Sequence, residues 1–330
     1  MDKKKYKKFF ITTILTMLVS TVLISVSLIY GGNYLVGRYT YSEDSAVVHG
    51  WIETKNKMAK QLDNNSNKIV FVGGSSTLHG LNSEYARKKS GLPILNYGIH
   101  AGLDVYIFEQ AKAILKPNDI VIMPLEFIFY EQTRDKLQSP LAEYIISYDN
   151  KYYRSQPLKQ KLWIMFFLVR YYLIHPNINN PRTIIEGINS SGDCIDHNGT
   201  TENFAKDGVY RQVSEKIPDD ISQLKLYDFI KYCQKNNIKV YATAPNAYHP
   251  KNLTPEEQVM INNILKFYKH LNVEFLGNFT DGFYDNKKLF CDTSYHLNTQ
   301  GSKLRTDFLL DLIYKNKIDK LVVKKNRERK

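Results

Sequence analysis

The pattern of apolar and polar positions predicts a parallel β-sheet flanked by helices. After a polar run at 63–67, short β-branched runs alternate with segments of helical periodicity, as in strands joined by helical crossovers. The run from Ile69 to Val72 is apolar on both faces, which predicts a central strand. The expected strands are 68–73, 93–98, 119–124, 238–244 and 272–276. The fold class is therefore α/β, a three-layer α/β/α arrangement around a central parallel sheet of about five strands.

Helical periodicity fills several of the segments between these strands. The clearest segment is 219–235, where apolar residues recur on one face behind the acidic pair Asp219 and Asp220, which suits a helix start. The other predicted helices are 51–62, 103–115, 254–270 and 304–313.

The N-terminal residues predict one transmembrane helix. Residues 9–30 are 22 residues without a charge, and a helix of that length spans roughly 33 Å, enough to cross a bilayer. The lysines of the basic tail 1–8 should stay in the cytoplasm, so the chain is expected in the cell membrane as a single-pass protein with its remainder outside the cytoplasm. A cleaved signal peptide is the alternative, but the stretch is long for one and no small-x-small site follows it.

The rest of the chain divides into a stalk at 31–67, an α/β domain at 68–314 and a basic tail at 315–330. The domain is interrupted by an insertion at about 127–217, which fits no strand-helix repeat. Inside the insertion, 162–174 is strongly apolar but too short to span a bilayer. We expect a helix packed on the core there, with an amphipathic lid or a helix resting on the membrane as the alternative.

Charge and cysteine content exclude several function classes. The net charge is +12, but +4 lies in residues 1–8 and +6 in 315–330, which leaves only about +2 for the body and argues against nucleic-acid binding. Cys194, Cys233 and Cys291 are isolated, so neither a zinc site nor a dense disulfide framework is indicated, although one disulfide with one cysteine left over stays open. No histidine cluster has metal-ligand spacing, so we expect no metal and no cofactor.

Two loops carry the residues suited to chemistry. The first strand ends in Gly73-Gly74-Ser75-Ser76, which places a hydroxyl at the carboxyl edge of the sheet, where open α/β folds bind ligands. A phosphate-binding loop is the alternative, but neither glycine-rich phosphate motif is present, and the G-x-S-x-G elbow is absent too. Asp292 and His296 share a loop after the last strand, where a carboxylate can fix the imidazole tautomer for proton transfer from a serine.

These segments resemble the SGNH (GDSL-type) hydrolase superfamily. Residues 74–80, GSSTLHG, are similar to its first block, residues 96–102 to its second, and Asp292 with His296-Leu297-Asn298-x-x-Gly301 to its last. The resemblance implies that Ser76 is the nucleophile, His296 the general base and Asp292 the orienting acid. An oxyanion hole is expected from the backbone N–H groups of Ser76 and of Ala101 or Gly102, and Asn246, just past the fourth predicted strand, is a candidate for a further amide donor.

The sequence departs from the family pattern at three places. Ser75 stands where the family usually has aspartate, and the final motif is D-x-x-x-H instead of D-x-x-H, so Asp281 or Asp285 are alternatives to Asp292. The third block, normally G-x-N-D, is replaced by 123–127, MPLEF, and an ionised Glu126 cannot donate a hydrogen bond. His79 and His100 are expected to be hydrogen-bonded structural groups and His249 a loop residue.

The resemblance to membrane-tethered envelope members implies serine-dependent acyl transfer or ester hydrolysis on a cell-surface polysaccharide. Such enzymes often work beside a multi-spanning membrane acyltransferase, which is the expected partner. Two alternatives remain: a lipid or lysophospholipid esterase with 162–174 as a membrane-facing lid, and a non-catalytic scaffold that binds glycan or a membrane partner. Fold-level analogy supports a reaction class and not a substrate.

Overall fold

The computed structural model describes residues 3–30, 43–63, 66–130, 139–174, 187–194, 198–207, 224–250 and 252–322. Its centre is a five-stranded parallel sheet in the order β2-β1-β3-β4-β6. The strands are β1 (Ile69–Gly73), β2 (Ile94–Gly98), β3 (Ile120–Met123), β4 (Lys239–Thr243) and β6 (Glu274–Leu276). All five predicted strands are confirmed, each within two residues of its expected start, and so is the α/β fold class.

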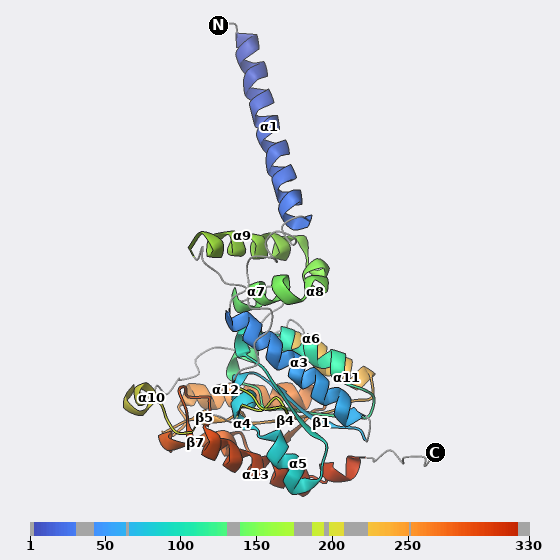
Figure 1. The fold of residues 1–330 in the computed structure, drawn as a ribbon, viewed down its shortest axis with the longest axis vertical. Coiled ribbons are helices and arrows are strands. Elements are labelled where there is room, and N and C mark those ends of the chain that lie inside the picture. Colours follow the sequence, from blue (N-terminus) through green and yellow to red (C-terminus); the bar gives the residue numbers. More distant parts are fainter. Residues whose placement is uncertain are drawn as a thin grey trace. The chain divides into compact units, whose positions relative to one another are not determined.

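Helices cover both faces of this sheet (Figure 1). On one face, β-strand residues such as Ile69 and Ile122 pack with Leu309 and Ile313 of α13 (Thr299–Lys315) and with Ala86 of α5 (Ser83–Ser90). On the other face lie three helices, α6 (Tyr106–Ile114), α11 (Lys225–Lys235) and α12 (Pro255–His270).

Aromatic contacts fix these three helices against one another and against the sheet. Phe108 of α6 stacks on Phe229 of α11 with ring centroids 4.9 Å apart, and Tyr268 of α12 meets Phe275 of β6 at 6.1 Å. Each helix matches a predicted one, with α11 beginning at Lys225. The acidic start expected at 219–220 lies outside the described residues.

Two compact units make up the chain: residues 1–49 with 137–184, and residues 50–136 with 185–330. The first contains α1 (Lys3–Tyr30), α7 (Ser139–Tyr148), α8 (Asn150–Ser155) and α9 (Leu158–Ile174). Residues 4–24 of α1 are long and apolar enough to cross a membrane, a property that signal sequences share. The second unit contains the sheet, and α3 (Glu43–Asp63) begins in the first unit and ends in the second.

A buried polar cluster ties α3 and the segment 187–194 to the sheet. The Lys55 ammonium, fully buried, donates to the carbonyl oxygens of Asn96 at 2.9 Å and of Gly192. Asp193 accepts from the Ser83 hydroxyl at 2.7 Å and from the Glu84 N–H at 2.9 Å. Burial lowers the pKa of Lys55 to about 8, against the attraction of Asp193. The 187–194 segment is therefore held to the body by charged and polar contacts.

A second buried cluster fixes the start of β1. Lys68, with no exposed side-chain surface, lies 2.6 Å from one carboxylate oxygen each of Asp63 and Asp119. Asp119 also accepts from the backbone N–H of Lys68 at 3.0 Å and of Lys116 at 2.8 Å. The lysine thus joins the end of α3 to two neighbouring strands at the amino edge of the sheet.

Replacing Lys68 by methionine is expected to lower the free energy of unfolding by about 3–5 kcal/mol, because a buried carboxylate at Asp119 loses its cation. The measurement is urea unfolding of the full chain in detergent at neutral pH. The matched control is Lys89→Met, whose pair with Asp307 is about half exposed and, screened by solvent, should contribute far less to stability. Equal losses in the two variants would show that the buried cluster is not a special source of stability.

Candidate active site

The proposed nucleophile lies at the carboxyl end of the central strand. Helix α4 (Ser75–Gly80) begins directly after β1, and Ser76 in its first turn is fully buried. The Ser76 hydroxyl donates to the backbone oxygen of Asn246, with 3.4 Å between the atoms. β1 has β2 on one side and β3 on the other, so the chain leaves it at the point where strand order reverses. Ligand sites of open α/β sheets form at this switch point.

Two glycines of the motifs that resemble the family stand where any side chain would clash with a neighbouring residue. A Cβ on Gly98 would lie 2.2 Å from the backbone nitrogen of Leu78, and one on Gly80 would lie 2.1 Å from Oδ1 of Asn246. The Asn96 amide secures the same contact by donating to the Leu78 and Leu81 oxygens at 3.1 and 2.7 Å. The short nucleophile helix is thus packed backbone to backbone on β2.

The proposed base and its acid form a hydrogen-bonded pair. Nδ1 of His296 lies 2.9 Å from Oδ1 of Asp292. Because an ionised carboxylate only accepts, Nδ1 carries the proton and Nε2 keeps a lone pair for a serine proton. The hydrogen bond with His296 lowers the pKa of Asp292 to about 2, so this carboxylate is ionised at all pH values above about 4. The carboxylate of Asp281 instead accepts from the Asn278 N–H at 2.7 Å.

Three contacts bring the His296 loop to the Ser76 turn. The ring of His79, one turn after Ser76 in α4, stacks on that of His296 with centroids 4.1 Å apart and 14° between planes. Asn246 accepts from the Ser76 hydroxyl through its backbone oxygen and donates through its side chain to the Tyr295 oxygen at 2.6 Å. The segments 73–80, 246 and 292–296, far apart in sequence, therefore meet at one edge of the sheet.

The Glu126 carboxylate occupies the backbone donors of the serine turn. Its Oε1 accepts from the Ser76 N–H at 2.7 Å and its Oε2 from the Gly74 N–H at 3.1 Å. The side chain follows β3, and only 4% of it is exposed. Burial raises the pKa of Glu126, while the two N–H bonds and the nearby His296 oppose the rise. An internal carboxylate therefore sits where the oxyanion donor of Ser76 is expected to act.

The other predicted oxyanion donors are placed as follows. The Gly102 N–H donates to Nδ1 of His100 at 3.0 Å, and the Asn246 amide donates to the Tyr295 oxygen. Ala101 lies beside the serine turn, since its Cβ is 3.0 Å from where a Cβ of Gly74 would be. The Ser76, Gly102 and Asn246 donors thus each have an acceptor within the protein.

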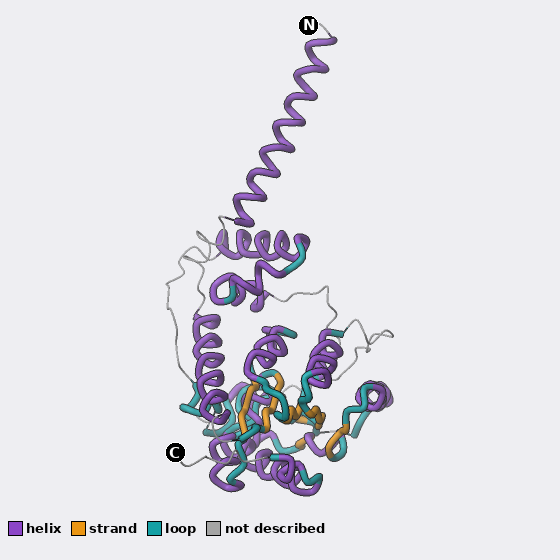
Figure 2. The backbone as a smooth tube through the Cα atoms, turned by 90° about the vertical axis from the view of Figure 1, so that its right-hand side faces the viewer, coloured by secondary structure: helices purple, strands orange, loops and turns teal. Residues whose placement is uncertain are grey.

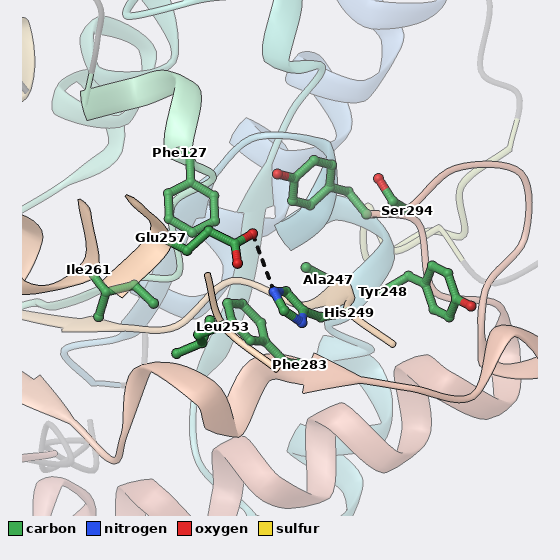
Figure 3. Close-up of a pocket in the computed structure, with 10 residues that line it drawn as sticks. Phe127, Ala247, Tyr248, His249, Leu253, Glu257, Ile261, Phe283 and Ser294 are labelled. Atoms are coloured by element: carbon green, nitrogen blue, oxygen red, sulfur yellow. Dashed lines mark ion pairs between the residues drawn. The ribbon is translucent and has the colours of Figure 1, made fainter. Parts of the chain in front are cut away.

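A small, mostly apolar pocket opens among residues that neighbour the site in the chain (Figure 3). Its cavity volume is about 10 Å³, room for about one water. Nε2 of His249 faces Oε1 of Glu257 at 3.4 Å, and the His249 ring stacks on Phe283 at 4.6 Å. The lining residues are Phe127, Ala247, Tyr248, His249, Leu253, Glu257, Ile261, Phe283, Ser294 and Tyr295. Three of them neighbour site residues in the chain: Phe127 follows Glu126, Ala247 follows Asn246 and Tyr295 precedes His296.

The Cys291 thiol lies at this edge, beside the Asp292 carboxylate. All three cysteines are buried thiols without a disulfide. Among the described residues, no group of three or more histidine, cysteine, aspartate or glutamate side chains is arranged to hold a metal ion.

The contacts of two residues at this edge, His79 and Glu126, were not expected from the sequence. His79 was expected to be a structural group, yet it is the ring against which His296 packs. Glu126 was recognised as a poor oxyanion donor, but no pattern in the sequence indicates that it accepts from the serine turn. A carboxylate directly after a buried strand adjacent to β1 is the signal that could have suggested this contact.

Comparisons with known proteins add little to this geometry. No protein-family model matches the chain, and no curated protein matches it significantly. Among solved structures, a candidate acylhydrolase from Bacteroides fragilis is similar over 78% of this chain and 94% of its own, with 11% identity and a TM-score of 0.38. That likeness is too low to carry an argument, so the assignment of function below rests on the residues themselves.

Proposed function

We propose that the protein is an SGNH-type serine esterase or O-acyltransferase that acts on acyl groups of a cell-surface polysaccharide. The observation that carries the proposal is the hydrogen-bonded Asp292–His296 pair, which packs on His79 of α4, the helix that holds Ser76 in its first turn. A buried hydroxyl, an imidazole and an ionised carboxylate at one sheet edge are the elements of nucleophilic acyl transfer. The N-terminal helix α1 supports a place at the cell membrane, with the sheet domain outside the cytoplasm.

The chemistry runs through an acyl-enzyme. Oγ of Ser76 attacks the ester carbonyl while Nε2 of His296 takes the hydroxyl proton, which then passes to the departing alkoxide. Water or a sugar hydroxyl then attacks the acyl-enzyme and restores Ser76. Asp292 stays ionised and stabilises the imidazolium that forms on His296.

The apolar pocket beside the site is the proposed place for the acyl group. Its walls include Phe127, Ala247 and Tyr295, each adjacent in the chain to a residue of the site. Apolar walls bury an acyl group favourably, and so small a cavity excludes long acyl chains. We therefore favour acetyl or a similarly small group.

The oxyanion needs the Ser76 N–H that Glu126 holds. A glutamine at 126 keeps the volume and one acceptor, and its amide can donate to the oxyanion as the asparagine of the family's third block does. We expect Glu126→Gln to raise kcat/KM for a small acetyl ester roughly tenfold, since one such donor is worth at least that much. The measurement is the initial rate of p-nitrophenyl acetate hydrolysis.

Glu126→Ala is the matched control, because alanine supplies neither an acceptor for the serine turn nor a donor for the oxyanion. It frees the Ser76 N–H without adding a second donor, so it should raise kcat/KM less than glutamine does. If glutamine and alanine both lower kcat/KM, the carboxylate itself is needed and does not block the oxyanion site.

The experiment that tests the function follows the acyl group. The full chain is incubated with p-nitrophenyl acetate, with and without an unacetylated polysaccharide, and released nitrophenol and free acetate are counted. Esterase activity gives equal amounts of both under either condition. A transferase releases less acetate than nitrophenol when the polysaccharide is present. A membrane acyltransferase partner would then be the natural source of acyl groups. No nitrophenol release and no acetylated polysaccharide would contradict the proposal.

A further inference from the structure

One face of α9 exposes large apolar side chains. Outside α1, seven large apolar residues are exposed among those the structure describes, and four of them lie on this helix: Leu158 (62%), Leu162 (42%), Trp163 (40%) and Phe166 (70%). Leu158, Leu162 and Phe166 recur at intervals of four residues, which places them in one row along the helix. Soluble surfaces rarely gather apolar residues in this way without a binding partner.

The opposite face of α9 already has its packing partner. Ile164 and Met165 are buried, and α9 contacts α7 within the same unit. Between residues 158 and 167 the helix therefore carries apolar residues on two sides, one turned to protein and the other uncovered. Packing on α7 explains the buried residues only, so the exposed row calls for another environment.

The neighbour of α9 points to that environment. Within their unit α9 contacts α1, the helix suited to cross a membrane, and both views show α9 lying across the end of α1 that is farther from the N-terminus (Figures 1 and 2). If α1 spans the bilayer, a helix against this end is at the outer membrane surface, and its uncovered face meets lipid.

Charged and aromatic residues fit the same surface. Arg154 and Lys159 are exposed beside the apolar row, where they can reach lipid phosphates. The Trp163 ring stacks on that of Phe167 at 5.8 Å, and tryptophan is enriched at membrane–water interfaces. Pairing of this face with a second copy would bring the same cations together, which disfavours that occupant.

We propose that α9 is an interfacial membrane helix whose Leu158, Leu162, Trp163 and Phe166 insert into the outward leaflet of the bilayer. The proposal goes beyond the proposed reaction and rests only on α1 as the membrane anchor. It makes the first unit a platform attached to the membrane at two places: α1 through the bilayer and α9 along its surface.

The fluorescence of Trp163 reports whether α9 enters the bilayer. The chain has two tryptophans, Trp51 and Trp163, so Trp51→Phe leaves a single emitter on α9. The full chain is reconstituted into vesicles of phosphatidylcholine and phosphatidylglycerol whose acyl chains are brominated either near the headgroup or near the terminal methyl. We expect blue-shifted emission, stronger quenching by the shallow bromines, and about twofold or greater protection from aqueous acrylamide, as an interfacial helix requires.

The matched control is Trp163→Phe, which keeps α1 and leaves Trp51 as the emitter. Bromine should not quench the emission of Trp51, so this variant separates tethering of the chain by α1 from insertion of α9 into the bilayer. Adding Leu162→Ser and Phe166→Ser to the Trp51→Phe protein should remove most of the quenching while the protein still floats with vesicles.

Three outcomes would overturn the proposal. Quenching of Trp163 by acrylamide and not by bromine places the face in water. Protection from both quenchers that disappears on dilution in lipid assigns the face to a second copy. A chain that does not float with vesicles removes the anchor on which the proposal stands.

Discussion

Ser76→Ala is expected to lower kcat/KM for p-nitrophenyl acetate by about 10⁴-fold or more, because no other group can form the acyl-enzyme. The hydroxyl is buried and makes a long hydrogen bond of 3.4 Å to the Asn246 oxygen, while Glu126 binds the backbone N–H, so removal of the hydroxyl costs little stability. Thermal unfolding of the variant should stay close to that of the wild type. The measurement is the steady-state rate of the full chain in detergent.

Ser75→Ala is the matched control, since Ser75 precedes Ser76 in the same turn and is less buried. It should keep activity within about tenfold of the wild type, as expected for a residue outside the bond-forming step. Loss in Ser75→Ala with activity retained in Ser76→Ala would move the nucleophile by one residue and contradict the alignment of GSSTLHG with the family motif.

His296→Gln should cost a similar factor, about 10⁴-fold, because an amide cannot accept and return the serine proton at neutral pH. Glutamine still reaches Asp292 by hydrogen bonding, so the loop 292–296 keeps its anchor. The measurement is the same ester hydrolysis, followed across pH for both proteins.

The variant His79→Phe tests which of the two stacked imidazoles acts as the base. Phenylalanine keeps a ring against His296 but has no proton to transfer, so activity should fall by less than about tenfold if His296 is the base. A collapse of activity in His79→Phe, with His296→Gln still active, would exchange the roles of the two histidines.

The α/β fold could be predicted because the sequence shows where each strand lies. Central strands such as β1 and β3 are buried on both faces and read as uninterrupted apolar runs between polar turns. Edge strand β6 is only three residues long, and its expected range was correspondingly less accurate. The order of the strands in the sheet, in which β1 lies between β2 and β3, cannot be predicted from such runs.

Contacts of the candidate site could be expected from the sequence only where both partners lie in one loop. Asp292 and His296 are four residues apart, so their hydrogen bond could be expected from the sequence and is present at 2.9 Å. Glu126 and Ser76 are 50 residues apart, and their contact depends on the neighbouring positions of β1 and β3. The stacking of His79 on His296 likewise arises from the packing of α4 against a distant loop, which no local pattern encodes.

The most direct test of the central claim is covalent labelling of the full chain with a serine-reactive fluorophosphonate, followed by mass mapping of the modified peptide. The account predicts one adduct on Ser76, absent from Ser76→Ala and strongly slowed in His296→Gln. An adduct on another serine, or none on a folded wild-type chain, would contradict it and favour a scaffold that binds without catalysis.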